Sequence, residues 1–241
     1  MENRQDNVRE FSQKDLKVLG TLFGLIAMMM AFATLTVQKV IQVNGLILPA
    51  STIWFLLITF PVMQIICANY GKKIANIAVF VGWVSMAVTT VMAHTLVVLP
   101  PAPVFEARNE IFNSLMSGSL RYFLAASFAY IVTHMLGNEY FSRLKFTKHL
   151  WIKSTVTSIC FVLVNTFTFT FAMFTGAMPF GNVVSIFFGT YVFRFCLIPV
   201  ITILFCIGHG IVYRVVNGKR QPKVAEVGRG KRAKVVSPHL R

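Results

Sequence analysis

Long apolar runs separated by short polar segments set the pattern of this chain. A helix that crosses a membrane needs about 20 predominantly apolar residues, because each residue adds about 1.5 Å along the helix axis. Six stretches meet this requirement, and we predict a transmembrane α-helix in each of them. They cover residues 18–37, 46–68, 74–97, 115–136, 154–174 and 183–212. The pattern therefore predicts an all-α membrane protein with six transmembrane helices.

The positively charged residues divide unevenly between the two sides of these predicted helices. With a cytoplasmic N-terminus, nineteen of the 23 Lys and Arg residues fall on the cytoplasmic side. Lys39 and Arg108 fall in the outer loops, whereas Arg121 and Arg194 lie within predicted helices. Because the cytoplasmic loops of membrane proteins carry an excess of Lys and Arg, we expect both termini in the cytoplasm.

The same pattern divides the chain into three parts. We expect a polar cytoplasmic lead at residues 1–16, a six-helix transmembrane domain at residues 17–213 and a basic, mobile cytoplasmic tail at residues 214–241. The longest outer segment lies between the third and fourth predicted helices. Its Phe105, Ile111 and Phe112 suit a short turn at the membrane interface.

Composition and charge support a membrane protein. Hydrophobic residues make up 56% of the 241 residues and charged residues 13%, whereas an ordinary soluble domain has about 25% charged residues. The net charge of +15 is typical of nucleic-acid binding as well, but the basic residues gather on one predicted side of the membrane. We therefore expect no nucleic acid partner. We expect instead a multi-pass protein of the cell inner membrane that contacts anionic lipids at its cytoplasmic face; a homo-oligomer is compatible with the sequence.

Several kinds of chemistry lack the residues that they need. The four cysteines lie in apolar stretches without the spacing of metal ligands. All eight acidic residues lie outside the predicted helices, so no carboxylate pair is available there for acid–base catalysis. We expect no enzyme activity, no metal and no cofactor.

Two arginines are the most informative residues of the predicted helices. A charge at the centre of a membrane-spanning helix costs about 2.5–3.5 kcal/mol and is usually paired. Arg121 and Arg194 have no carboxylate at membrane depth, so their counter-charge could arrive with a bound ligand. The alternative is that they bond to backbone carbonyls freed near Pro61 and Pro199. The first interpretation predicts a substrate-binding role for both arginines.

Three further polar residues complete the predicted binding site. Gln64 follows Pro61 by three residues, and Asn165 lies in the fifth predicted helix. Their amides suit the hydrogen-bonding edge of a heterocycle, but hydrogen bonds between helices explain them equally well. His134, near the inner end of the fourth predicted helix, is a further candidate ligand contact.

Four segments of the chain resemble the vitamin uptake transporter family, which includes queuosine precursor transporters. They are IWFLLITFPVMQIICANYGKKIANI, SLRYFLAASFAYIVTHMLGNEYFSRLK, WIKSTVTSICFVLVNTFTFTFAMF and YVFRFCLIPVITIL. The resemblance implies a six-helix fold related to the substrate-binding components of vitamin transporters. It also implies roles for individual positions. Arg121 and Arg194 match basic residues of the family, His134 falls where the family often has Gln, and Gln64 and Asn165 fall where it has Asp.

The resemblance and the residues together predict an importer of a small polar molecule. By resemblance the cargo is a queuosine precursor of the 7-deazaguanine type. The loss of two acidic residues beside two retained arginines leaves an anionic cargo, such as a carboxylate or a siderophore, as an alternative. A membrane scaffold without transport activity is the other alternative.

Overall fold

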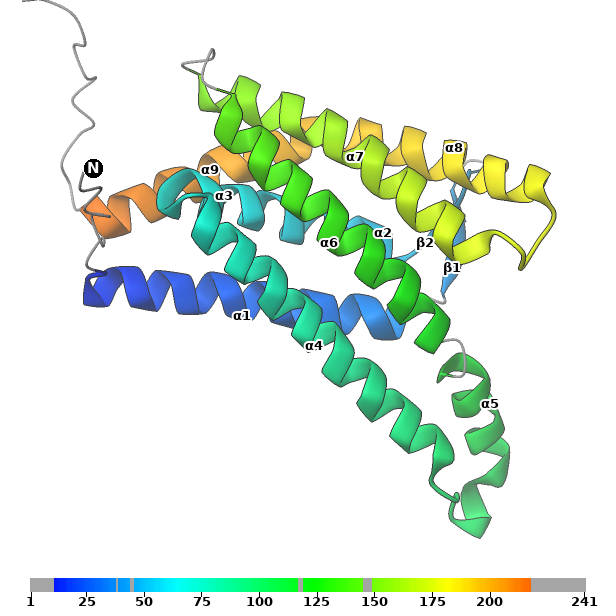
Figure 1. Ribbon diagram of the computed structural model, residues 1–241. Helices are drawn as coiled ribbons and strands as arrows, with labels where there is room; N and C mark the ends of the chain where they lie inside the picture. Colours follow the sequence, from blue (N-terminus) through cyan, green and yellow to red (C-terminus); the bar gives the residue numbers. More distant parts are fainter. Residues whose placement is uncertain (1–10, 38, 44–45, 117–118, 145–148, 218–241) are drawn as a thin grey trace, which may run out of the picture.

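The computed structural model describes residues 11–37, 39–43, 46–116, 119–144 and 149–217. The predicted polar lead up to residue 10 and the predicted basic tail from residue 218 lie outside the described residues. The helices run back and forth along one long axis, so the molecule is an elongated bundle (Figure 1).

The chain first passes along this axis in α1 (Gln13–Thr36). A short hairpin of β1 (Val40–Val43) and β2 (Leu46–Pro49) follows. The return pass is one continuous rod of α2 (Ser51–Trp54), the π-helix η1 (Phe55–Thr59) and α3 (Phe60–Tyr70). The remaining elements are α4 (Lys72–Val98), the 3-10 helix η2 (Pro103–Phe105), α5 (Glu106–Met116), α6 (Ser119–Arg143), α7 (Leu150–Phe174), α8 (Phe180–Cys196) and α9 (Ile198–Asn217).

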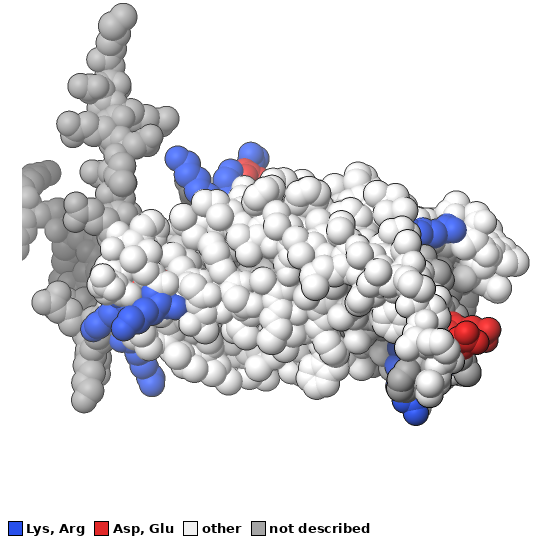
Figure 2. All heavy atoms as spheres, turned by 90° about the horizontal axis from the view of Figure 1, so that it is seen from below, with Lys and Arg blue, Asp and Glu red and all other residues white. Residues whose placement is uncertain are grey.

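The bundle has two distinct ends (Figure 1). The hairpin end holds β1, β2, α5 and the connection from α7 to α8. The basic end holds the start of α1, the turn between α3 and α4, and the ends of α6 and α9. On the face shown in Figure 2, charged side chains lie near the two ends and leave a broad uncharged band between them.

Apolar helices of membrane-spanning length confirm the predicted class of fold. Among the described residues, five segments are long and apolar enough to cross a membrane: 13–36, 51–70, 72–98, 150–174 and 198–216. The helix α8 is apolar but has only 17 residues. The helix α6 has 25 residues and is long enough, although it is not one of these five segments. The described part of the chain is thus almost entirely helical, with the hairpin as its one sheet.

The hairpin corrects the predicted start of the second helix. We predicted a helix from residue 46, but residues 46–49 form β2, and the helix begins at Ser51. The two strands pair antiparallel, with Val40 opposite Pro49 and Val43 opposite Leu46. The sequence between them is Asn44-Gly45, a dipeptide typical of two-residue hairpin connections. This local signal outweighs the apolar character of the flanking residues.

The last predicted helix is broken in two. The helix α8 ends at Cys196 and α9 begins at Ile198, with Leu197 between them. Pro199 has no backbone N–H, so it cannot donate to the carbonyl one turn earlier, and its ring disfavours a continuous helix. The Leu197 N–H instead donates to the carbonyl of Arg194 over 3.1 Å. Arg194 therefore lies in the final turn of α8, next to the break.

The outer segment and the fourth helix also differ from the prediction. In place of a short interfacial turn, the chain forms η2 and the 11-residue α5. Residues 115 and 116 belong to α5, so the fourth long helix starts at Ser119 rather than at residue 115 and continues to Arg143.

The core lies where α1, α4 and α6 cross. Ile26 and Met30 of α1 pack with Val79 of α4 and Tyr130 of α6, and all four are buried. Small side chains such as Ala129 let helix backbones approach closely, which is the usual basis of helix packing in membranes. This packing leaves the opposite faces of these helices apolar and exposed, as expected for contact with lipid.

Gly71 should be intolerant of any side chain for backbone reasons alone. Its φ of 85° and ψ of 170° lie in a region that is essentially restricted to glycine. A Cβ atom at Gly71 would meet nothing within 4 Å, so packing does not contribute. We expect Gly71→Ala to lower the free energy of unfolding in detergent by about 1–3 kcal/mol. The matched control is Gly24→Ala in α1, also without close neighbours, which should stabilise by about 0.5–1 kcal/mol. Equal effects of the two changes would contradict the argument.

Glu139 should make stability depend on acid pH. It forms ion pairs with Lys72 at the start of α4 and with Arg143 one turn along α6. Hydrogen bonds from Lys72 and then Arg143 hold the pKa of the Glu139 carboxyl below its ordinary value of 4.5. The resulting stabilisation is complete above that value and is lost as the pH falls through the lowered pKa.

The measurement compares the thermal midpoints of the wild type and Glu139→Gln between pH 3 and pH 7. The wild type should melt higher at neutral pH, and the difference should shrink below pH 4.5 and also in high salt, because the pair is exposed. A difference that is independent of pH would show that Glu139 acts through packing rather than charge.

Candidate functional site

A buried arginine forms the centre of the candidate site. Arg194 has only 4% of its surface exposed. Its Nη1 donates to Asn165 Oδ1 over 2.7 Å and to Thr166 Oγ1 over 3.1 Å, and its Nη2 donates to Thr52 Oγ1 over 3.3 Å. All three acceptors are neutral, so they satisfy hydrogen bonds of the guanidinium without balancing its charge.

Breaks in regular structure bring these groups together. Thr52 lies in the first turn after the hairpin, immediately before the π-helix η1. Arg194 lies in the last turn of α8, before the break at Leu197. Asn165 and Thr166 come from the middle of α7, which is continuous. The end of α8 and the start of α2 therefore meet against one face of α7.

A small cavity lies against this arginine. Its volume is about 40 Å³, and both Asn165 and Arg194 line it. Aromatic side chains form much of the remaining wall, among them Phe55, Tyr122 and Tyr130. Pro49 and Ser51 line the cavity at the hairpin end of the bundle. A guanidinium, an amide and aromatic faces around one cavity are suited to binding a small, polar, planar molecule.

Gln64 lies at a different level of the bundle. Its Nε2 donates to Ser158 Oγ over 3.1 Å, and its Oε1 accepts from Ser154 Oγ over 2.5 Å. These bonds join α3 to α7 in a buried position, on the side toward the basic end. Gln64 does not line the cavity beside Arg194. It lines a separate hollow of about 10 Å³, which is too small for a second ligand site.

His134 is enclosed by aromatic rings between these two levels. Its ring centroid lies 4.5 Å from that of Tyr130, 4.7 Å from that of Phe161 and 5.7 Å from that of Phe60. Its Nε2 is buried without a hydrogen-bond partner among the described residues. His134 lines the small hollow of Gln64 and not the cavity of Arg194.

Arg121 lies at the surface near the hairpin end. Its side chain is exposed, and Nη2 donates to the backbone carbonyl of Thr175 over 2.9 Å. Thr175 caps the C-terminal end of α7, so Arg121 fastens α6 to that helix end. This bond goes to a backbone carbonyl, as in the alternative considered from the sequence, but the carbonyl lies at the end of α7 and not near Pro61 or Pro199.

The five predicted site residues thus separate into distinct places. The structure brings Asn165 and Arg194 together, whereas Gln64, His134 and Arg121 lie outside their cavity. The sequence analysis missed Thr52, Tyr122 and Tyr130. Thr52 follows the hairpin that we did not predict. The two tyrosines, Tyr122 and Tyr130, share one face of α6 eight residues apart, a spacing that could have identified them.

No carboxylate balances the charge of Arg194 within the described residues. The ion pairs found there both involve Glu139, which lies at the basic end of α6. The described ranges also contain no group of three or more His, Cys, Asp or Glu side chains that could hold a metal ion. Recognition at the cavity would therefore depend on the guanidinium, amides, hydroxyls and aromatic rings.

We predict that the hydrogen bonds of Gln64 with Ser154 and Ser158 stabilise the folded protein by joining α3 to α7. A double-mutant cycle of Gln64→Ala and Ser158→Ala, measured by unfolding in detergent, should give a coupling energy of about 0.6–2 kcal/mol. The control cycle pairs Gln64→Ala with Ser85→Ala, whose hydroxyl bonds to the Ala27 carbonyl elsewhere in the bundle. That pair should be additive within about 0.5 kcal/mol. Additivity in both cycles would rule out the interhelical role.

Comparison with known proteins identifies the family. The family model described as "Putative vitamin uptake transporter" matches residues 49–208, which is more than half of the chain. The match begins at the end of the hairpin and extends into α9. It therefore includes Arg194 and its hydrogen-bond partners Thr52, Asn165 and Thr166. No curated protein and no solved structure matches the chain significantly. The chain therefore belongs to the family of putative vitamin uptake transporters.

Proposed function

We propose that this protein imports a small polar molecule across the cell inner membrane and binds it at the cavity beside Arg194. The observation that carries the proposal is a buried guanidinium that borders a cavity, in a chain of a transporter family. Charged side chains are expensive at membrane depth and are usually kept there for function.

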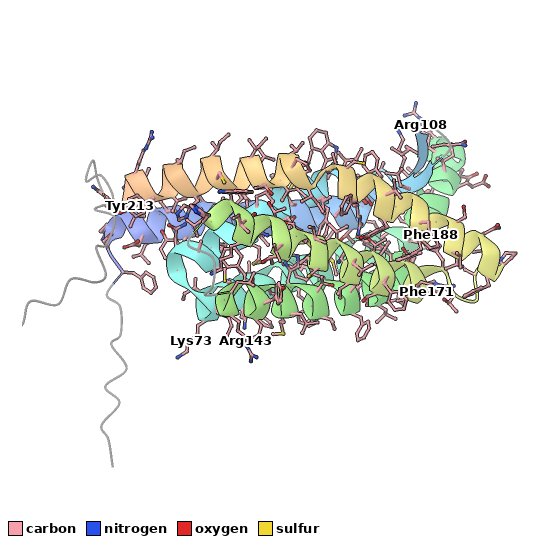
Figure 3. The ribbon with its side chains drawn as sticks, turned by 90° about the horizontal axis from the view of Figure 1, so that it is seen from above. Lys73, Arg108, Arg143, Phe171, Phe188 and Tyr213 are labelled. Atoms are coloured by element: carbon pink, nitrogen blue, oxygen red, sulfur yellow. The ribbon has the colours of Figure 1, made fainter. Side chains whose placement is uncertain are left out.

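Six membrane crossings would follow from the course of the chain. The passes are α1, the rod at residues 51–70, α4, α6, α7, and α8 with α9 together, and successive passes run in opposite directions (Figure 1). The basic end holds Lys14, Lys17, Lys72, Lys73 and other basic residues in the turns and helix ends. In Figure 3 the labelled Lys73 and Arg143 lie toward that end, and Arg108 lies at the other. The excess of positive charge favours an orientation in which the basic end, and with it both termini, lies in the cytoplasm.

The cargo would enter from the hairpin end. Two hollows of about 360 Å³ flank the hairpin, and each shares a residue with the inner cavity, Ser51 on one side and Pro49 on the other. Small-molecule sites usually have volumes of about 300–1,000 Å³, so the inner cavity must widen to admit a cargo. The structure would then correspond to a closed state of the transport cycle.

By family resemblance the cargo is a queuosine precursor of the 7-deazaguanine type. The Asn165 amide offers a donor and an acceptor to the edge of such a heterocycle, and Tyr122 and Phe55 offer aromatic faces. The transporter family favours this function over a membrane scaffold without transport activity.

Uptake of a labelled 7-deazaguanine by cells or proteoliposomes tests the proposal. We expect Arg194→Gln to lower the ratio of maximal rate to half-saturation concentration by about ten- to a hundredfold, because a hydrogen bond to a charged group is worth about 1.5–3 kcal/mol. The matched control is Arg214→Gln, the same change at an exposed position near the end of α9. Thermal midpoints of both variants verify that they fold. Saturable uptake that is unchanged in Arg194→Gln would remove this cavity from the transport mechanism.

A further inference from the structure

The charge around the inner cavity is unbalanced in one direction. Arg194 contributes a full positive charge, and its partners Asn165, Thr166 and Thr52 contribute none. None of the residues that line the cavity is an Asp or a Glu. A buried charge without a partner is strongly unfavourable, so the site is most stable when an anion supplies the missing charge.

Two buried groups on residues that line the cavity lack hydrogen-bond partners among the described residues. They are Nε of Arg194 and the hydroxyl of Tyr130. Both side chains are more than nine-tenths buried. The Nε–H of arginine can only donate, and the tyrosine hydroxyl can also donate. The unused Nε–H of the guanidinium suits an oxygen atom of an acid group, whereas the Tyr130 hydroxyl lies against Gly82 of α4.

The approach to the cavity is also positive. The hollow of about 360 Å³ that shares Ser51 with the inner cavity is also lined by Phe32, Lys39, Trp54 and Met116. Lys39 is exposed, and no Asp or Glu lines this hollow. An anion that enters here would pass one positive charge before it reaches a second, buried one. Such an arrangement raises the rate of association of anions.

We infer that the cargo carries a carboxylate, which binds Arg194 while an attached aromatic heterocycle lies among the aromatic side chains of the cavity wall. The inference rests on the proposed transport function and narrows its substrate class to small heterocyclic acids. The Asn165 amide then completes the hydrogen bonds to the ring edge, and Tyr130 contributes its aromatic face. The matching amide or nitrile of the same heterocycle would leave the arginine charge unbalanced.

Matched pairs of ligands test this inference by thermal stabilisation and by titration of the detergent-solubilised protein. One pair is 7-deazaguanine with a carboxylate or with a carboxamide at position 7. The other is pyridine-3-carboxylate and pyridine-3-carboxamide. Within each pair the shapes are nearly equal and the charge differs. We expect the acid to bind at least about tenfold more tightly than the amide in a pair that binds, because the charge-assisted bond is lost in the amide.

The same titrations with variants show which residues produce the preference for the acid over the amide. Arg194→Gln should reduce the ratio of acid to amide affinity to about one, Arg194→Lys should retain part of it, and Arg214→Gln should leave it unchanged. Lys39→Gln should slow association of the acid at low salt by about two- to tenfold and leave the amide unaffected, with Lys73→Gln as its control. The ratio of acid to amide affinity does not depend on the yield of folded protein, so a variant that folds in lower yield can still be compared.

The outcomes separate this inference from the proposed function. If an amide binds as tightly as its acid in the wild type, the inference is overturned while binding and transport stand. If a pyridine acid binds and neither deazaguanine does, the inference holds and the deazaguanine cargo is wrong. If no ligand of either pair binds, both the proposed cargo and the inferred class are overturned.

Discussion

The hydrogen bonding of one buried guanidinium connects the parts of the chain that form the hairpin end of the bundle. A charge that has left water must be given acceptors, and those of Arg194 come from α2 and α7. Thr52 reaches it because β2 of the hairpin packs against α8, so that α2 starts close to α8. The hairpin, the helix break and the cavity are therefore connected, because each contributes to the surroundings of the same buried charge.

Breaks in the helices are tolerated here because protein surrounds them. In a membrane every backbone N–H and C=O needs a partner, so irregular backbone occurs where neighbouring helices or a cavity supply one. The π-helix η1 precedes Pro61, and the break at Leu197 precedes Pro199. Both irregular segments lie beside the cavity or next to its lining, whereas α1, α4 and α7 are continuous.

Apolar periodicity was sufficient to predict the long helices, since a run of about 20 apolar residues has few other structures in a membrane. Arg194 and Asn165 could be selected one by one, because they are polar residues inside such apolar runs. The apolar pattern could not pair them, because they belong to different helices whose contact depends on tertiary packing. Gln64 lies twelve residues from Thr52 along the rod at residues 51–70 and lines a separate hollow, a placement that the sequence pattern alone could not show. The hairpin was missed because the apolar pattern continues through residues 46–49.

The break between α8 and α9 also has a thermodynamic consequence. Arg194 lies within one turn of Leu197, where two rigid segments meet, so a change of angle there moves the guanidinium relative to Asn165 and Thr52. The affinity for the proposed cargo would then differ between two such angles. By linkage, binding shifts the population toward the angle with the higher affinity to the same extent. The residue proposed to hold the cargo is thereby also placed to couple cargo binding to the angle between α8 and α9.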